Sequence, residues 1–73
     1  MMLNDIEIDK EVIIKRINCS DSIKRRIMDL GIIEKTKIKP VFKSPLGDPI
    51  AYEVRGSLIA LRKEETERIE VHD

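Results

Sequence analysis

Two side chains in this sequence bind soft metals well, and they lie far apart along the chain. Cys19 is the sole cysteine and His72 the sole histidine. A structural zinc site takes about four such ligands at short spacings, so this pair predicts no zinc or iron site. The acidic residues leave hard-metal binding open, although no calcium-loop spacing is present. A thiol just before a helix start can have a lowered pKa, but a helix start alone is weak evidence for this at Cys19.

Catalytic chemistry lacks its usual groups. A nucleophilic serine or cysteine needs a neighbouring base, and His72 lies at the very end of the sequence. All three glycines fall in turn positions, and none belongs to a phosphate-binding loop. Small barrels that bind nucleic acid use exposed aromatic rings, whereas Phe42 and Tyr52, the two aromatics, are expected to be packed. We therefore predict a chain that is not an enzyme and has no nucleic-acid partner.

The residues best suited to recognising a protein partner lie in a basic stretch, Arg25-Arg26-Ile27-Met28-Asp29. Guanidinium groups fork onto carboxylates, so Arg25 and Arg26, with Asp29 beside them, are candidate docking residues. The alternative is a local pair, because Arg25 and Asp29 have the (i, i+4) spacing that stabilises a helix by about 0.3–0.5 kcal/mol. The sequence leaves both interpretations open.

Three further candidates follow from turn chemistry. The stretch Ser44-Pro45-Leu46-Gly47-Asp48-Pro49 is a rigid turn that offers Leu46 and Asp48 to a partner at low entropic cost. The alternative is that this turn only fixes a hairpin, since Gly and Pro are needed for it in any case. Arg62 either braces the fold through a local pair or contributes to the same docking surface.

The composition limits the class of protein. The chain has 73 residues, of which 41% are hydrophobic and 38% charged, so we expect a single folded domain over residues 1–73. The net charge is zero, but residues 15–43 are basic, which suits an acidic partner, a phosphate, a membrane face or simply a solvated surface. A lone cysteine, no signal peptide and no apolar run of about 20 residues predict a cytoplasmic protein without membrane insertion.

The expected elements are short. Ile6 and Ile8 lead into a first strand that ends at Ile17. A helix over about residues 21–30 has Ser20 as its N-cap and Gly31 as its C-cap. Strands follow at 36–43, where Pro40 indicates an edge or a bulge, then at 50–55 and 58–62. The apolar run of the strand at 58–62 predicts a central, buried position. A helical turn near 63–66 and a closing strand at 68–72 complete a mainly β, five-stranded SH3-like barrel with one inserted α-helix.

In order and spacing, the motifs resemble those of the FeoA-like family, small SH3-like barrels of bacterial ferrous iron uptake. The resemblance rests on four stretches and covers residues 3 to 71: Arg25-Arg26-Ile27-Met28-Asp29-Leu30-Gly31, Ser44-Pro45-Leu46-Gly47-Asp48-Pro49-Ile50, Gly56-Ser57-Leu58-Ile59-Ala60-Leu61-Arg62 and Ile69-Glu70-Val71. Two departures stand out. Asp9 replaces a usual glycine, and Glu34-Lys35 replaces Pro-Gly, so we expect a looser or differently shaped turn there.

The resemblance implies a non-enzymatic accessory protein of ferrous iron uptake. Its implied partner is the membrane Fe(II) permease that carries a cytoplasmic GTPase domain, so the chain would be cytoplasmic and peripheral to the inner membrane. It implies no cofactor, leaves a transition-metal ligand open, and suits a monomer or a weak oligomer. The alternative is a soluble metal-responsive sensor, or a regulatory barrel akin to the SH3-like domain of metal-dependent repressors.

Overall fold

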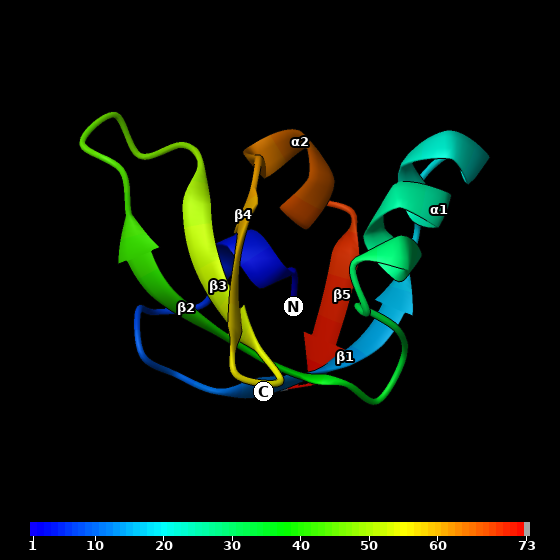
Figure 1. The fold of residues 1–73 in the computed structure, drawn as a ribbon, viewed down its shortest axis with the longest axis horizontal. Coiled ribbons are helices and arrows are strands. Elements are labelled where there is room, and N and C mark those ends of the chain that lie inside the picture. Colours follow the sequence, from blue (N-terminus) through cyan, green and yellow to red (C-terminus); the bar gives the residue numbers. More distant parts are fainter. Residues whose placement is uncertain (73) are drawn as a thin grey trace.

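The fold is a strongly curled antiparallel sheet with one helix inserted after its first strand (Figure 1). The computed structural model describes residues 1–72. The strands are β1 (Val12–Ile17), β2 (Lys37–Lys43), β3 (Ile50–Val54), β4 (Ser57–Leu61) and β5 (Ile69–His72). The helices are the 3-10 turn η1 (Leu3–Asp5), α1 (Asp21–Asp29) and α2 (Lys63–Thr66). The predicted mainly β class, with its inserted helix and the turn near 63–66, is confirmed.

The strands lie in the order β4-β3-β2-β1-β5, and every neighbouring pair is antiparallel. Bulges interrupt the pairing between Ile14 and Arg16 in β1 and between Pro40 and Phe42 in β2. Bulges bend strands and increase twist, which lets so few strands wrap around a core. The core is almost wholly aliphatic: Leu3, Ile6, Val12, Ile14, Ile17, Ile27, Ile32, Ile38, Tyr52, Val54, Leu61, Ile69 and Val71.

The ends of α1 follow the sequence signals closely. Ser20 occupies the N-cap position in an extended conformation, although its side chain makes no capping hydrogen bond. Gly31 follows the helix with φ of +87°, a left-handed conformation that glycine adopts without strain. Between them the helix buries Ile27 completely and presents its charged residues to solvent.

β4 is at one edge of the sheet, so its predicted central position is wrong. It pairs only with β3, and Leu58 on its outer face is 68% exposed. The apolar run does not predict the position of the strand, because an unprotected edge strand can have the same apolar composition as a central strand. The prediction that Ile6 and Ile8 lead directly into the first strand is also wrong, since both lie in the connection between η1 and β1, and the strand begins only at Val12.

The two aromatic residues differ in their exposure to solvent. Tyr52 is fully buried, as expected, but Phe42 is 62% exposed, so the prediction that both are packed is wrong for Phe42. In a regular strand Phe42 would share a face with the buried Ile38 and Pro40. The bulge between Pro40 and Phe42 breaks that alternation and leaves the ring outside. The bulge itself was one of the two outcomes expected for Pro40.

Both departures from the family pattern have left-handed backbones. Asp9 and Lys35 each have φ of +71°. Asp tolerates this conformation, whereas for lysine it is uncommon. The turn at Lys35 is still hydrogen-bonded: the Lys35 N–H donates to Ile14 O at 2.7 Å and the Thr36 N–H to Ile33 O at 3.2 Å. The expected loosening of that turn is therefore not found.

Candidate interaction surface

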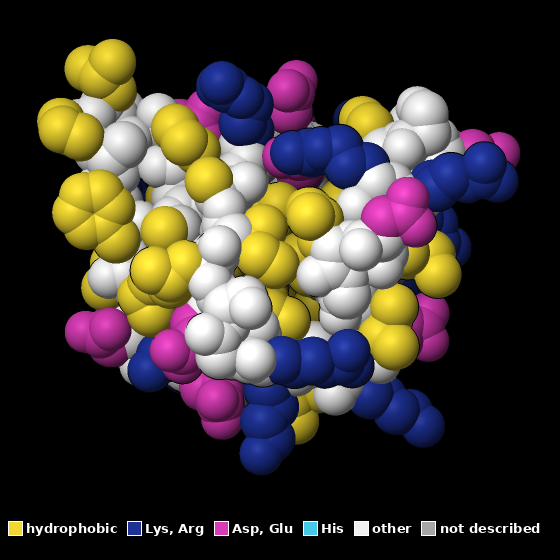
Figure 2. Space-filling model, in the orientation of Figure 1, with side chains coloured by type: hydrophobic (Ala, Val, Ile, Leu, Met, Phe, Trp, Pro, Cys, Tyr) yellow, Lys and Arg dark blue, Asp and Glu magenta, His cyan; other side chains and the backbone are white. Residues whose placement is uncertain are grey.

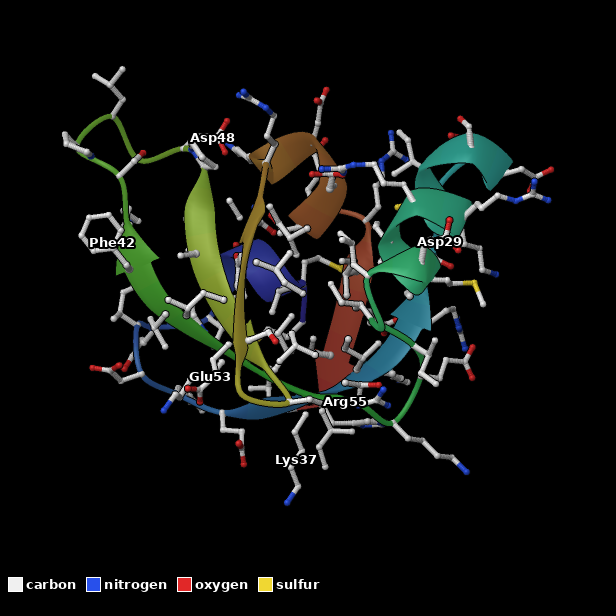
Figure 3. All side chains as sticks on the ribbon, in the orientation of Figure 1. Asp29, Lys37, Phe42, Asp48, Glu53 and Arg55 are labelled. Carbon is white, nitrogen blue, oxygen red and sulfur yellow. The ribbon has the colours of Figure 1, made fainter. Side chains whose placement is uncertain are left out.

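The exposed face of α1 carries the first candidate residues. Arg25 and Asp29 lie with Lys24 and Met28 around a shallow hollow, and Asp29 projects outward in Figure 3. No ion pair joins Arg25 to Asp29 in residues 1–72, despite their (i, i+4) spacing. Met28 is 46% exposed on the same face. Both charges are therefore available to a partner, with an apolar side chain between them.

Arg26 lies apart from this face and braces the fold. Its guanidinium forms an ion pair with the carboxylate of Glu65, whose side chain is 5% exposed. This contact joins α1 to α2, two elements that are distant in the sequence. A buried carboxylate is stable only when it is paired and hydrogen-bonded, so Arg26 has a structural role that its neighbour Arg25 lacks.

Glu65 is the polar residue that sequence reasoning missed. Besides Arg26, it accepts a hydrogen bond at Oε1 from the backbone N–H of Arg62 at 3.0 Å, which caps the start of α2. In a capping box, the Glu three residues after the N-cap residue accepts a hydrogen bond from the N-cap backbone N–H. The spacing of Arg62 and Glu65 was therefore the sequence signal that could have identified Glu65. Arg62 therefore stabilises this contact with its backbone N–H, whereas its side chain is exposed.

The turn at residues 44–49 is hydrogen-bonded to α2 at one end, and its tip is exposed to solvent. Asp48 Oδ1 accepts a hydrogen bond from the Lys63 N–H at 2.9 Å, so it caps α2 across space. Leu46, in contrast, is 94% exposed. Phe42, labelled in Figure 3, is exposed on the same β2–β3 hairpin, and we call Leu46 and Phe42 the apolar corner. Hydrophobic side chains gather on the left side of the molecule in Figure 2. The sequence predicts an exposed Leu46 but not an exposed Phe42, because Pro40 signals a bulge without showing that the bulge turns the Phe42 ring outward.

A second apolar feature lies between α1 and the end of β1. Ile17, Met28 and Ile33 line a hollow of about 300 Å³, with Lys24 and Glu34 at its rim. Met28 and Ile33 are each about two-fifths exposed, at 46% and 40%. The tertiary fold leaves this side of α1 uncovered.

The soft-metal candidates lie at opposite ends of one strand pair. His72 pairs with Ile13, whereas Cys19 follows Ile17 at the other end of β1. Burial raises the pKa of the Cys19 thiol above its ordinary value, against the lowering effect of Arg68 and Lys24, so its place before a helix start does not lower the pKa. Among residues 1–72 no three His, Cys, Asp or Glu side chains cluster as metal ligands would.

Part of the basic charge is already neutralised on the surface. Lys39 pairs with Glu53 at 3.6 Å across β2 and β3, and Lys15 pairs with Glu70 at 3.5 Å across β1 and β5. Exposed pairs of this kind contribute only about 0–1 kcal/mol each. The strands therefore offer less free positive charge than the sequence suggests, and the candidate surface is concentrated on α1 and the apolar corner.

The helices in the described part of the chain are all too short to cross a bilayer. The longest, α1, has 9 residues.

Comparison with known proteins gives one consistent answer. The family model described as "FeoA domain" matches residues 1–73. A FeoA-like protein from Clostridium acetobutylicum is 40% identical, with a TM-score of 0.90 over 99% of this chain and 84% of that one. FeoA of Stenotrophomonas maltophilia, solved in complex with zinc and described as an SH3 domain protein, is 26% identical, with a TM-score of 0.85 over 99% of this chain and 89% of that one.

A longer relative places such a domain beside a transporter. The Fe(2+) transport protein A/Fe(2+) transporter FeoB fusion protein of Porphyromonas gingivalis is 28% identical over 71 residues. That match covers 97% of this chain but only 8% of the fusion protein, so the fusion carries a large part that has no counterpart here.

Proposed function

Because this chain belongs to the FeoA family of SH3-like ferrous iron transport proteins, we propose that it is an accessory protein that binds the cytoplasmic, GTPase-containing part of an Fe(II) permease. The Porphyromonas fusion protein carries this proposal. Joining two modules in one chain raises their effective concentration for each other, which is useful when the two must meet. A separate small chain reaches the same partner by docking. It would then lie at the cytoplasmic face of the membrane through its partner.

We assign the docking to two surfaces. Arg25, Asp29 and Met28 on α1 combine free charge with an apolar centre, and Phe42 and Leu46 at the apolar corner supply exposed anchors. Interfaces of this kind are enriched in arginine, methionine and aromatic residues. Asp48 follows Leu46 in the turn at residues 44–49, and Arg62 lies at the start of α2, the helix that Asp48 caps.

The test measures binding of the purified protein to its host's detergent-solubilised permease by biolayer interferometry. Arg25→Glu and Leu46→Asp should each weaken binding by about tenfold or more, as loss of an interface anchor does. Glu7→Gln, an exposed change on the N-terminal segment, is the matched control and should leave the affinity unchanged. Wild-type protein that fails to bind at both low and moderate salt would contradict the proposal.

One observation favours a second candidate function. The Stenotrophomonas relative was solved with zinc, which raises metal sensing as an alternative role. Ligand that binds the native state raises its stability by mass action, so Zn(II) or Fe(II) would shift the thermal midpoint of this protein. A shift that survives Cys19→Ala and His72→Ala would place the metal on carboxylates, whereas no shift at all would remove this candidate.

A further inference from the structure

The two edges of the sheet are treated differently. At the β5 edge, the Val71 N–H donates to Met1 O at 2.8 Å, and Met2 forms a β-bridge with Glu70, so the N-terminal segment covers the strand. At the β4 edge, no backbone hydrogen bond beyond the ladder with β3 involves β4 in residues 1–72. The fold therefore closes one edge and leaves the other bare.

The register shows which groups of β4 are free. Val54 pairs with Ser57 across a two-residue turn, Arg55-Gly56, in which both residues have positive φ, as in a type I′ hairpin. The pair that closes such a turn is hydrogen-bonded, and hydrogen-bonded pairs alternate along an antiparallel ladder. The pairs formed by Leu58 and Ala60 are consequently the non-bonded ones, and their N–H and C=O groups point away from β3.

β4 has none of the features that usually protect an edge. Its five residues include no charge and no proline, and its pairing with β3 is free of bulges. Ile59 faces the core opposite the fully buried Tyr52, yet it is only half-buried, because nothing flanks it on its outer side. Hydrophobic side chains show at the centre of this face in Figure 2, between β4 and α1.

An unpaired cation lies at the hairpin end of this edge. A Cβ at Gly31 would be 3.8 Å from Arg55 Nη1, so the Arg55 guanidinium extends from the hairpin toward the end of α1 (Figure 3). Arg55 is in no ion pair among the described residues, and the lysines at positions 35 and 37 lie around the same depression. Glu11 and Glu53 share that depression, but Glu53 is already paired with Lys39. This end attracts a carboxylate.

We propose that the outer edge of β4 binds an extended segment of a partner protein as an additional strand. Backbone groups of Leu58 and Ala60 hydrogen-bond it, an apolar residue covers Ile59, and an Asp or Glu meets Arg55. A second copy of this chain fits poorly, because antiparallel pairing of two β4 strands brings Arg55 of one copy near Arg62 and Lys63 of the other. Assigning the segment to the permease rests on the proposed function.

The experiment removes one edge donor without touching the β3 ladder. Ala60→Pro deletes the outward N–H and places a ring where the added strand would lie, and proline is tolerated on an edge. Ala60→Ser keeps the N–H and is the matched control. Against the solubilised permease, Ala60→Pro should bind about tenfold more weakly and Ala60→Ser within about twofold of wild type. Circular dichroism and urea unfolding establish that both variants are folded.

A second variant keeps the test decisive if Ala60→Pro does not fold. Arg55→Asn removes the charge but suits a left-handed residue, here with φ of +52°. It should weaken binding at low salt and flatten the salt dependence, whereas Lys43→Gln, an exposed cation at the far end of β2, should not.

The outcomes separate the two proposals. Wild-type binding that neither folded Ala60→Pro nor Arg55→Asn weakens overturns strand addition and leaves the permease partnership standing. Wild-type protein that does not bind the permease overturns both. If sedimentation shows a wild-type dimer that Ala60→Pro dissociates, a second copy occupies the edge and the proposed partner is wrong.

Discussion

At the scale of single residues, Glu65 is the side chain whose removal we expect to destabilise the fold most. It is almost fully buried, it pairs with Arg26 of α1, and it caps α2 through the Arg62 N–H. Removing one partner of a buried pair costs more than the pair contributes, because the other partner keeps its desolvation penalty.

We therefore expect Glu65→Ala to lower the free energy of unfolding by about 2 kcal/mol, the range for a charged hydrogen bond with a lost cap. Urea denaturation followed by circular dichroism measures this. The adjacent, exposed Glu64→Ala is the control and should change stability by no more than about 0.5 kcal/mol. Equal effects of the two substitutions would contradict the structural role of Glu65.

The same geometry changes how a docking experiment should be read. Arg26→Glu would set two carboxylates together against a buried site, so weaker binding by that variant would report a damaged fold. Arg25 has no partner to lose in the described chain and gives the cleaner test.

A second residue-scale prediction concerns the left-handed positions. Lys35 has φ of +71° and Gly31 has φ of +87°. Lys35→Gly should raise the free energy of unfolding by up to about 1 kcal/mol, and Gly31→Ala should lower it by about 1 kcal/mol. Space is not the cause at Gly31, since the nearest atom to an added Cβ is 3.8 Å away. Urea unfolding of the two variants and the wild type measures both free energies. The argument would be disproved if the two substitutions changed the free energy of unfolding in the same direction.

At the scale of elements, α2 is held at its start by a residue from another part of the chain. With four residues, α2 cannot be stable alone, and the Asp48 carboxylate caps its first N–H. Asp48→Ala should cost about 1 kcal/mol, whereas Asp48→Asn, which keeps an acceptor oxygen, should cost less. Thermal unfolding of the two variants checks this, and identical midpoints would show that the cap contributes nothing.

Elements whose first and last residues are determined by nearby cap and turn residues were predictable from the sequence. Ser20 and Gly31 bracket α1, and Gly56 marks the hairpin between two strands of β composition. The hairpin turn is nevertheless Arg55-Gly56, one residue before the Gly56-Ser57 position that the predicted strands at 50–55 and 58–62 leave for it. Such signals depend on backbone preferences that act within a few residues.

Elements whose environment depends on distant partners were not predictable. The exposure of Phe42 follows from a bulge, and the edge position of β4 follows from the strand order. Pro40 signals the bulge, but nothing near Phe42 shows that its ring turns to solvent, and nothing within β4 shows that the strand lies at an edge. The candidate site was affected in the same way: the sequence identified Arg25, Asp29 and Leu46, but it did not show that Arg26 pairs with Glu65 or that Asp48 caps α2.

At the scale of the whole molecule, stability should fall in alkaline solution. Burial raises the pKa of the Cys19 thiol above 9.0 and that of the Tyr52 phenol above 10.0, their ordinary values. The unfolded chain therefore releases these protons first. The resulting stabilisation is complete below the ordinary values and is lost as pH rises through the folded-state values.

Urea unfolding between about pH 8 and pH 11 should show this decline. Cys19→Ala should remove the part of the slope that begins near 9.0, and Tyr52→Phe the part that begins near 10.0. A slope that is unchanged in both variants would mean that other groups cause the alkaline destabilisation.

The N-terminal segment that covers β5 has a consequence for synthesis. A ribosome makes Met1 well before residues 69–72, yet the Val71 N–H donates a hydrogen bond to Met1 O, and β1 pairs with β5 along most of its length. Contacts between the ends of a chain form late and slow its folding. A nascent chain stalled before Ile69 would leave this edge of β1 unpaired, so the domain folds only after residues 69–72 have been made.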